Sequence, residues 1–224
     1  MGPRSLVVGC ALLTLGGGCT FQDARLRAPS ADAVASGDRI DGSPAIVMAP
    51  SFVDERPDRG RCGMKKAASK PAARVDCDAA PNQWLAKLLV GELRATGFQV
   101  YEHEAPPGQP VVRIEGFLTQ LFVEPDVKTE YYVLYASGHY IPEADIAVRL
   151  VASGASFQAE RNFYVKGVGE YMGGALESNF QLALDNSTRE SLRRMVAAIA
   201  ELVNLAPGFE QYACATARAA SASR

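Results

Sequence analysis

Residues 144–151 read Ala144-Asp-Ile-Ala-Val-Arg-Leu-Val151, and Ile, Val and Leu recur at every second position. Such alternation is typical of a half-buried strand, because successive side chains of a strand point to opposite faces of its sheet. The turn segment Ala152-Ser-Gly-Ala155 follows, and residues 157–168 return as a second apolar run. The pattern therefore predicts an antiparallel hairpin.

A helix is predicted upstream of this hairpin, over residues 83–96, with Gly97 at its C-terminal end. Because Trp84 lies on the apolar stripe of this helix, we expect it to anchor the core rather than to bind a ligand. A second helix is predicted near the C-terminus, from Leu176 to Val203 or from the capping-box pattern at residues 187–190. The apolar stripe of the first helix comprises Trp84, Leu85, Leu88, Leu89 and Leu93.

Further apolar runs predict strands at residues 45–53, 98–101, 111–123 and 131–135. The main elements then follow the order β-α-β-β-β-β-α. Strands that follow one another between helices favour an α+β domain. We expect a mixed, mostly antiparallel sheet with the two main helices packed on one face.

Residues 1–18 have the features of a bacterial signal peptide, since Arg4 precedes an uncharged stretch that runs to Gly18. The stretch is shorter than the roughly 20 apolar residues that a spanning helix needs. Its end, Leu15-Gly-Gly-Gly-Cys19, resembles the lipobox of bacterial lipoproteins, although the aliphatic residue stands one position early. We expect cleavage before Cys19 and lipidation of its thiol.

Two other interpretations of this segment remain open. Val7-Val-Gly-Cys10 fits the local lipobox pattern better, but it would leave a very short apolar region. Conventional cleavage would leave Cys19 as an ordinary thiol and the protein soluble in the periplasm. Thr20, in place of an aspartate, implies the outer membrane by resemblance to the best-studied sorting rule, with the domain facing the periplasm.

The rest of the chain divides into a tether, a domain and a tail. Residues 19–43 are rich in Ala, Ser, Asp and Gly, which predicts a flexible tether with a reach of roughly 25–30 Å. Residues 44–210 are expected to form a single α+β envelope domain. Residues 211–224 are small and polar, and we expect a loose tail there.

The cysteines that remain after cleavage are expected to meet an oxidising compartment. Cys62 and Cys77 bracket one loop, and we expect them to pair. Closing a loop of about 15 residues stabilises a fold by about 3 kcal/mol. Cys214 is left over, so it is either free or replaces one member of the pair.

The segment 54–80 is long for a loop in a compact domain, and it is basic. Between residues 56 and 74 its only acidic residue is Asp58. Such a patch either contacts an anionic surface, such as lipid headgroups, or is a solvated insertion. The residues for this anionic-surface contact are Arg56, Arg59, Arg61, Lys65, Lys66, Lys70 and Arg74.

Other features of the sequence argue against several functional classes. The formal net charge is −2 and no basic tail is present, so we expect no nucleic-acid partner. His139, Glu143 and Asp145 are the best metal or acid–base candidates, but a single short segment rarely closes such a site, and we expect no metal. The glycines of residues 166–174 match no phosphate-binding motif, so we expect no cofactor.

With these elements in place, the chain resembles YajG-like small envelope lipoproteins. The resemblance rests on the lipobox-like segment, the order of elements and the run Ile46-Val-Met-Ala-Pro-Ser-Phe-Val-Asp-Glu-Arg56. It covers most of residues 45–205 and departs from the family pattern in the insertion between Cys62 and Cys77. The resemblance implies a lipoprotein that binds or scaffolds, and it supplies no catalytic residues.

The sequence thus favours a non-enzymatic, lipid-anchored envelope lipoprotein that binds or scaffolds a protein partner. The alternative is an auxiliary lipoprotein in lipid or lipopolysaccharide transport, and a periplasmic hydrolase is a distant third. An apolar groove large enough for an acyl chain would favour the lipid carrier, whereas a filled core with an exposed patch would favour the scaffold. A hydrolase would need a polar pocket with convergent titratable groups.

Overall fold

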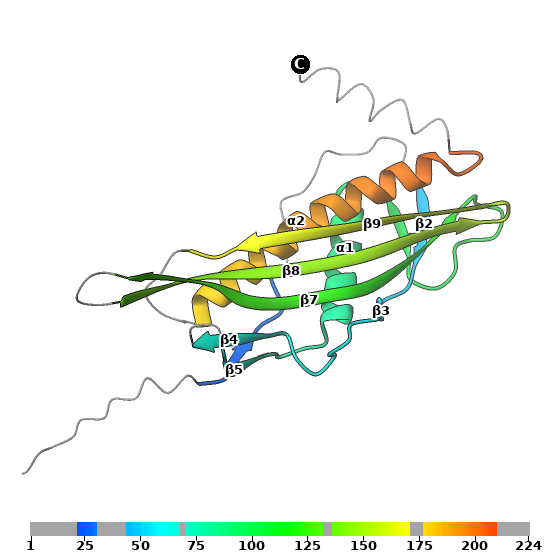
Figure 1. Cartoon of the computed structure of the whole chain (residues 1–224). Helices are drawn as coiled ribbons and strands as arrows, with labels where there is room; N and C mark the ends of the chain where they lie inside the picture. The colour runs from blue at the N-terminus through cyan, green and yellow to red at the C-terminus, as the bar shows by residue number, and fades with distance from the viewer. Residues whose placement is uncertain (1–21, 31–43, 68–69, 132–135, 171–176, 210–224) are drawn as a thin grey trace, which may run out of the picture.

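The computed structural model describes residues 22–30, 44–67, 70–131, 136–170 and 177–209 (Figure 1). Over these ranges the chain forms a nine-stranded sheet and two helices. The helices are α1 (Pro81–Ala95) and α2 (Glu177–Asn204). The strands are β1 (Ala24–Leu26), β2 (Ala45–Met48), β3 (Val53–Asp54), β4 (Gly63–Ala67), β5 (Lys70–Cys77), β6 (Gln99–Tyr101), β7 (Val112–Tyr131), β8 (Ala136–Gly154) and β9 (Phe157–Val168).

The long strand β7 organises the sheet. One edge of β7 pairs antiparallel with β8 along nearly its whole length, and β8 in turn pairs antiparallel with β9. The other edge is divided among three short parallel strands, which are β2 at residues 112–114, β3 at residues 117–118 and β4 at residue 123. Beyond them, β6 pairs with β2, while β5 and β1 extend the sheet past β4.

Both helices lie on one side of the long strands, behind β7–β9 in Figure 1. The buried residues of α1 and α2, such as Leu89 and Ile199, join Leu118 of β7 and Ile146 of β8 in one apolar core. Helix α2 approaches β9 closely, because a Cβ atom on Gly167 would lie 2.3 Å from the backbone nitrogen of Ser187. The α+β class, the mixed sheet and the predicted hairpin of β8 and β9 are confirmed.

The structure differs from the sequence expectation in two segments before α1. Residues 24–26, expected within the tether, form β1, in which Ala24 and Leu26 are buried. The insertion at 54–80, expected to be a loop, contains the antiparallel pair β4 and β5. Strand β1 pairs with β5, about fifty positions away, and the β4–β5 hairpin joins the sheet at Val123 of β7. Local periodicity does not report such contacts between distant parts of the sequence.

Several expectations fall outside the described residues. Cys19, Cys214, most of the tether and the tail 211–224 are among them. Within the described ranges, neither helix combines the length and the apolar character that a membrane span requires.

The pairing of β4 with β7 depends on a glycine. Gly63 lies opposite Val123, whose backbone nitrogen donates a 2.8 Å hydrogen bond to the carbonyl of Cys62. A Cβ atom on Gly63 would lie 2.0 Å from the carbonyl oxygen of Val123. A larger residue at this position therefore has to push the two strands apart.

We expect Gly63→Ala to lower the free energy of unfolding by about 1–3 kcal/mol, the usual cost of overpacking a tight contact. Gly154→Ala is the matched control, because a Cβ atom there meets nothing within 4 Å. Urea denaturation of both variants measures the difference. Equal midpoints for the two variants would contradict the tight approach of β4 to β7.

Candidate functional site: a groove along helix α1

A groove of about 1100 Å³ lies beside α1 on the surface of the described part of the chain. Most of its lining is apolar. Ligand sites for small molecules are typically about 300–1,000 Å³ and mostly apolar, with a few polar groups. The groove therefore has the size and the character of a binding site.

Two walls of the groove are formed by the segments that follow the neighbouring strands β1 and β5. Strands β1 and β5 pair in parallel, with Leu26 opposite Cys77, so their C-terminal ends meet at the same edge. The backbone nitrogen of Asp78 donates a 2.8 Å hydrogen bond to the carbonyl of Leu26, which holds the two exits side by side. The residues that follow, 28–29 from β1 and 79–80 from β5, line the groove.

The third wall is the turn between β2 and β3, where Pro50 and Ser51 line the groove. Two hydrogen bonds fix this turn to the start of α1. The backbone nitrogen of Phe52 donates to the carbonyl of Asn82 at 3.1 Å, and the side-chain amide of Asn82 donates back to the carbonyl of Phe52 at 2.9 Å.

Helix α1 supplies the floor of the groove. Trp84, Leu88 and Gly91 all line it and recur at helical spacing, so they form one stripe along the helix. Trp84 is only 7% exposed and also belongs to the core, so the expected core anchor is at the same time part of the groove floor. Gly91 leaves the groove open, because a Cβ atom there would meet nothing within 4 Å.

Polar groups stand on either side of this stripe. Gln83 and Lys87 are exposed in the first half of α1. Toward the C-terminal end of α1, Arg94 donates to the carboxylate of Glu102 at 3.2 Å and to the carbonyl of Val100 at 3.2 Å. Glu92 also lines the groove, and its partial burial raises the pKa of its carboxyl group.

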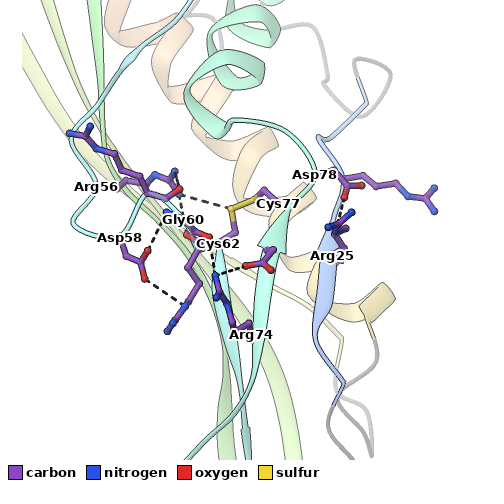
Figure 2. The surroundings of a disulfide bond; sticks show 12 residues. Arg25, Arg56, Asp58, Gly60, Cys62, Arg74, Cys77 and Asp78 are labelled. Carbon is purple, nitrogen blue, oxygen red and sulfur yellow. Dashed lines mark hydrogen bonds and ion pairs between the residues drawn. A yellow bond between two sulfur atoms is a disulfide. The ribbon is translucent and has the colours of Figure 1, made fainter.

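A disulfide stabilises the strand that leads into the groove. Cys62 and Cys77 are joined, as expected from the sequence, with their Cα atoms 5.6 Å apart (Figure 2). Cys77 is the last residue of β5 and directly precedes the wall segment that begins at Asp78. On the other side of β5, the side chain of Arg25 forms a 3.6 Å ion pair with Asp78. The exit from β5 is therefore held from both sides.

A buried arginine shapes the turn before Cys62. The guanidinium of Arg56 binds both carboxylate oxygens of Asp54 at 2.9 Å and donates to the carbonyls of Arg59 and Arg61. Burial would raise the pKa of the Asp54 carboxyl group, but the hydrogen bonds and the charge of Arg56 outweigh it and hold that pKa below its ordinary value. Asp54 and Arg56, which stand at the end of the run that begins at Ile46 in the sequence, thus stabilise this turn.

The basic residues of the insertion do not form one exposed patch. Arg56 and Lys65 are buried, so neither contributes to the exposed surface. Three others lie in ion pairs, Arg61 with Asp58, Lys66 with Glu124 and Arg74 with Asp76. Asp58 and Asp76 lie close to their partners in sequence, whereas Glu124 comes from β7. The two that remain exposed, with no ion-pair partner among the described residues, are Arg59 and Lys70.

Two of the metal or acid–base candidates from the sequence, Glu143 and Asp145, are already hydrogen-bonded to other side chains. Strand β8 continues through Pro142, and Glu143 and Asp145 lie on its outer face. Glu143 accepts a 2.6 Å hydrogen bond from Lys166, and Asp145 accepts one from the hydroxyl of Tyr164. The side chain of His139 lies outside the described part of the structure. Among the described residues, no group of His, Cys, Asp and Glu is arranged to hold a metal ion.

The fold is similar to that of several solved structures, at low sequence identity. No protein-family model and no curated protein matches the chain. A Xanthomonas campestris structure from family DUF330 is 11% identical and covers 79% of this chain and 92% of its own, with a TM-score of 0.47. An uncharacterized protein is 12% identical over 70% of this chain and 99% of its own, with a TM-score of 0.44.

A third structure is described as a homolog of neuraminyllactose-binding hemagglutinin from Helicobacter pylori. It is 10% identical over 80% of this chain and 94% of its own, with a TM-score of 0.39. At these identities and TM-scores the neighbours support no statement about function. They name no YajG-like family, so that resemblance stays a prediction.

Removing the disulfide should destabilise the domain. In the double variant Cys62→Ser/Cys77→Ser, the unfolded chain regains the freedom of a closed loop whose ends are 15 residues apart. We expect a loss of about 3 kcal/mol in the free energy of unfolding, measured in urea without reductant. Reducing the unmodified protein should produce the same loss. A double variant as stable as the oxidised protein would contradict a structural role for this bond.

The buried ion pair of Asp54 with Arg56 should contribute more stability than the exposed pair of Asp58 with Arg61. Asp54→Ala leaves the Arg56 charge buried without its partner and should cost about 3 kcal/mol at neutral pH. Asp58→Ala removes only the exposed pair with Arg61 and should cost less than about 1 kcal/mol. Because the pKa of Asp54 is lowered, its stabilising effect is complete above its ordinary value of 3.8 and is lost as the pH falls through the lowered pKa. Equal losses at neutral pH would contradict the role given to Arg56.

Proposed function

We propose that this protein is a non-enzymatic, lipid-anchored envelope lipoprotein that binds a lipid in the groove along α1. The observation that carries the proposal is the groove itself, with its apolar floor of Trp84 and Leu88 and its volume of about 1100 Å³. In this reading Cys19 holds the domain at the outer membrane, facing the periplasm. The function is that of an auxiliary protein in lipid or lipopolysaccharide transport.

Two properties of the groove favour an acyl chain as its ligand. The apolar stripe runs lengthwise along α1, which suits an elongated ligand, and each CH₂ group that leaves water contributes about 0.8 kcal/mol. The polar side chains line the groove beside this stripe, where a headgroup can keep contact with water. These properties also support a ligand that enters from the side, because the groove is open to solvent.

A protein partner remains the second candidate, and a different surface favours it. One face of β7–β9 is turned away from the helices (Figure 1). This face carries half-buried or exposed apolar side chains among charged ones. Arg149 stacks on the ring of Phe117 at 3.9 Å and also binds Glu55 at 2.9 Å. Aromatic and arginine side chains are enriched at protein interfaces. The apolar residues of this face include Phe117, Phe122, Ile141, Tyr164 and Val168.

The lipid proposal is tested by filling the groove. Gly91→Leu adds a side chain where Gly91 leaves space, and it also removes a glycine from a helix interior, which favours folding by up to about 1 kcal/mol. Binding of a palmitoyl probe is followed by the fluorescence of Trp84, which is the single tryptophan of the chain. We expect at least about tenfold weaker binding, which corresponds to about 1.4 kcal/mol of binding free energy. The thermal stability should be unchanged or higher.

Ala95→Leu is the matched control, because Ala95 is exposed on α1 but does not line the groove. It should bind the probe like the unmodified protein. If Gly91→Leu and Ala95→Leu bind equally well, or if the unmodified protein binds no acyl probe, the groove is not a lipid site.

A further inference from the structure

The two halves of the groove differ in their charges. Gln83 and Lys87 lie one helical turn apart in the first half of α1, and both line the groove. Among the described residues, neither side chain has a hydrogen-bond or ion-pair partner. In the second half, Glu92 adds a carboxyl group, and Arg94 is already engaged by Glu102. An anion entering the groove therefore meets free donors at one end and carboxylates at the other.

From this asymmetry we propose that the groove binds one acyl chain of an anionic glycerophospholipid, with its headgroup phosphate at Gln83 and Lys87. The chain then lies along Trp84, Leu88 and Gly91. This inference rests on the proposed function and adds to it the class of lipid and the direction in which the lipid is bound.

The chemistry of the two donors fits a phosphate. A lysine ammonium is a compact cation with three donors, and it binds phosphate as a point charge. The amide of Gln83 can donate to a second phosphate oxygen without a competing charge. Lys87 and Glu92 are five residues apart, so they point to different sides of the helix, and Glu92 does not neutralise Lys87.

The experiment compares two probes that share one palmitoyl chain and differ in the net charge of the headgroup. Palmitoyl lysophosphatidylglycerol is anionic, and palmitoyl lysophosphatidylcholine is zwitterionic. Each is titrated, below the concentration at which it forms micelles, into the full chain carrying Cys19→Ser, which removes the expected acylation site. Trp84 fluorescence reports binding. We expect the unmodified groove to bind the anionic probe more tightly.

Lys87→Gln should weaken binding of the anionic probe about fivefold, the size expected for one solvent-exposed ion pair. It should weaken the zwitterionic probe less, because the choline cation of that probe offsets the charge of its phosphate. Lys87→Arg should retain the preference for the anionic probe. Lys70→Gln is the control, because it removes another exposed cation, from the β4–β5 hairpin, that does not line the groove. Thermal unfolding of each variant verifies that the domain is intact.

The outcomes separate this inference from the function on which it rests. If both probes bind equally well and Lys87→Gln changes neither affinity, the headgroup assignment is overturned and the lipid site stands. If Lys70→Gln produces the loss and Lys87→Gln does not, the headgroup binds the hairpin and the assignment is again overturned. If neither probe changes Trp84 fluorescence, the proposed function and this inference both fail.

Discussion

The structure depends on the way in which the two edges of β7 are used. One edge carries the continuous β8–β9 hairpin, and the other is divided among β2, β3 and β4. The junction at β4 is a single residue pair, which joins Gly63 to Val123 without room for a side chain. Through it the β4–β5 hairpin and β1 are held to the sheet, and the groove walls begin at the ends of β5 and β1.

The insertion between β3 and α1 therefore has a structural purpose that connects to the site. Arg56 and Asp54 fold its first turn, the Cys62–Cys77 bond closes it, and β5 then delivers residues 79–80 to the groove. Its positive charges are largely matched by nearby carboxylates. The contribution of the insertion to binding is therefore the wall that residues 79–80 form in the apolar groove beside α1.

The sequence predicted the parts of this fold that depend on local patterns. The alternation at residues 144–151, the apolar stripe of α1 and the spacing of Cys62 and Cys77 each led to the observed element. Strand β1 was missed because it has three residues and pairs with β5, about fifty positions away. The groove was missed for the same reason, since three distant segments build it. Its one local signal, Trp84 on the apolar stripe, equally indicates an ordinary core residue.

The central claim is that a lipid lies against α1 and not on the open face of the sheet. Photocrosslinking with an acyl chain that carries a diazirine tests this directly, because the attached residues are identified by peptide mapping. The account predicts attachment to the groove segments, at residues 28–29, 50–51 and 79–80 and along α1 from Gln83 to Gly91. Attachment concentrated on β8 and β9, or spread evenly over the surface, would contradict it.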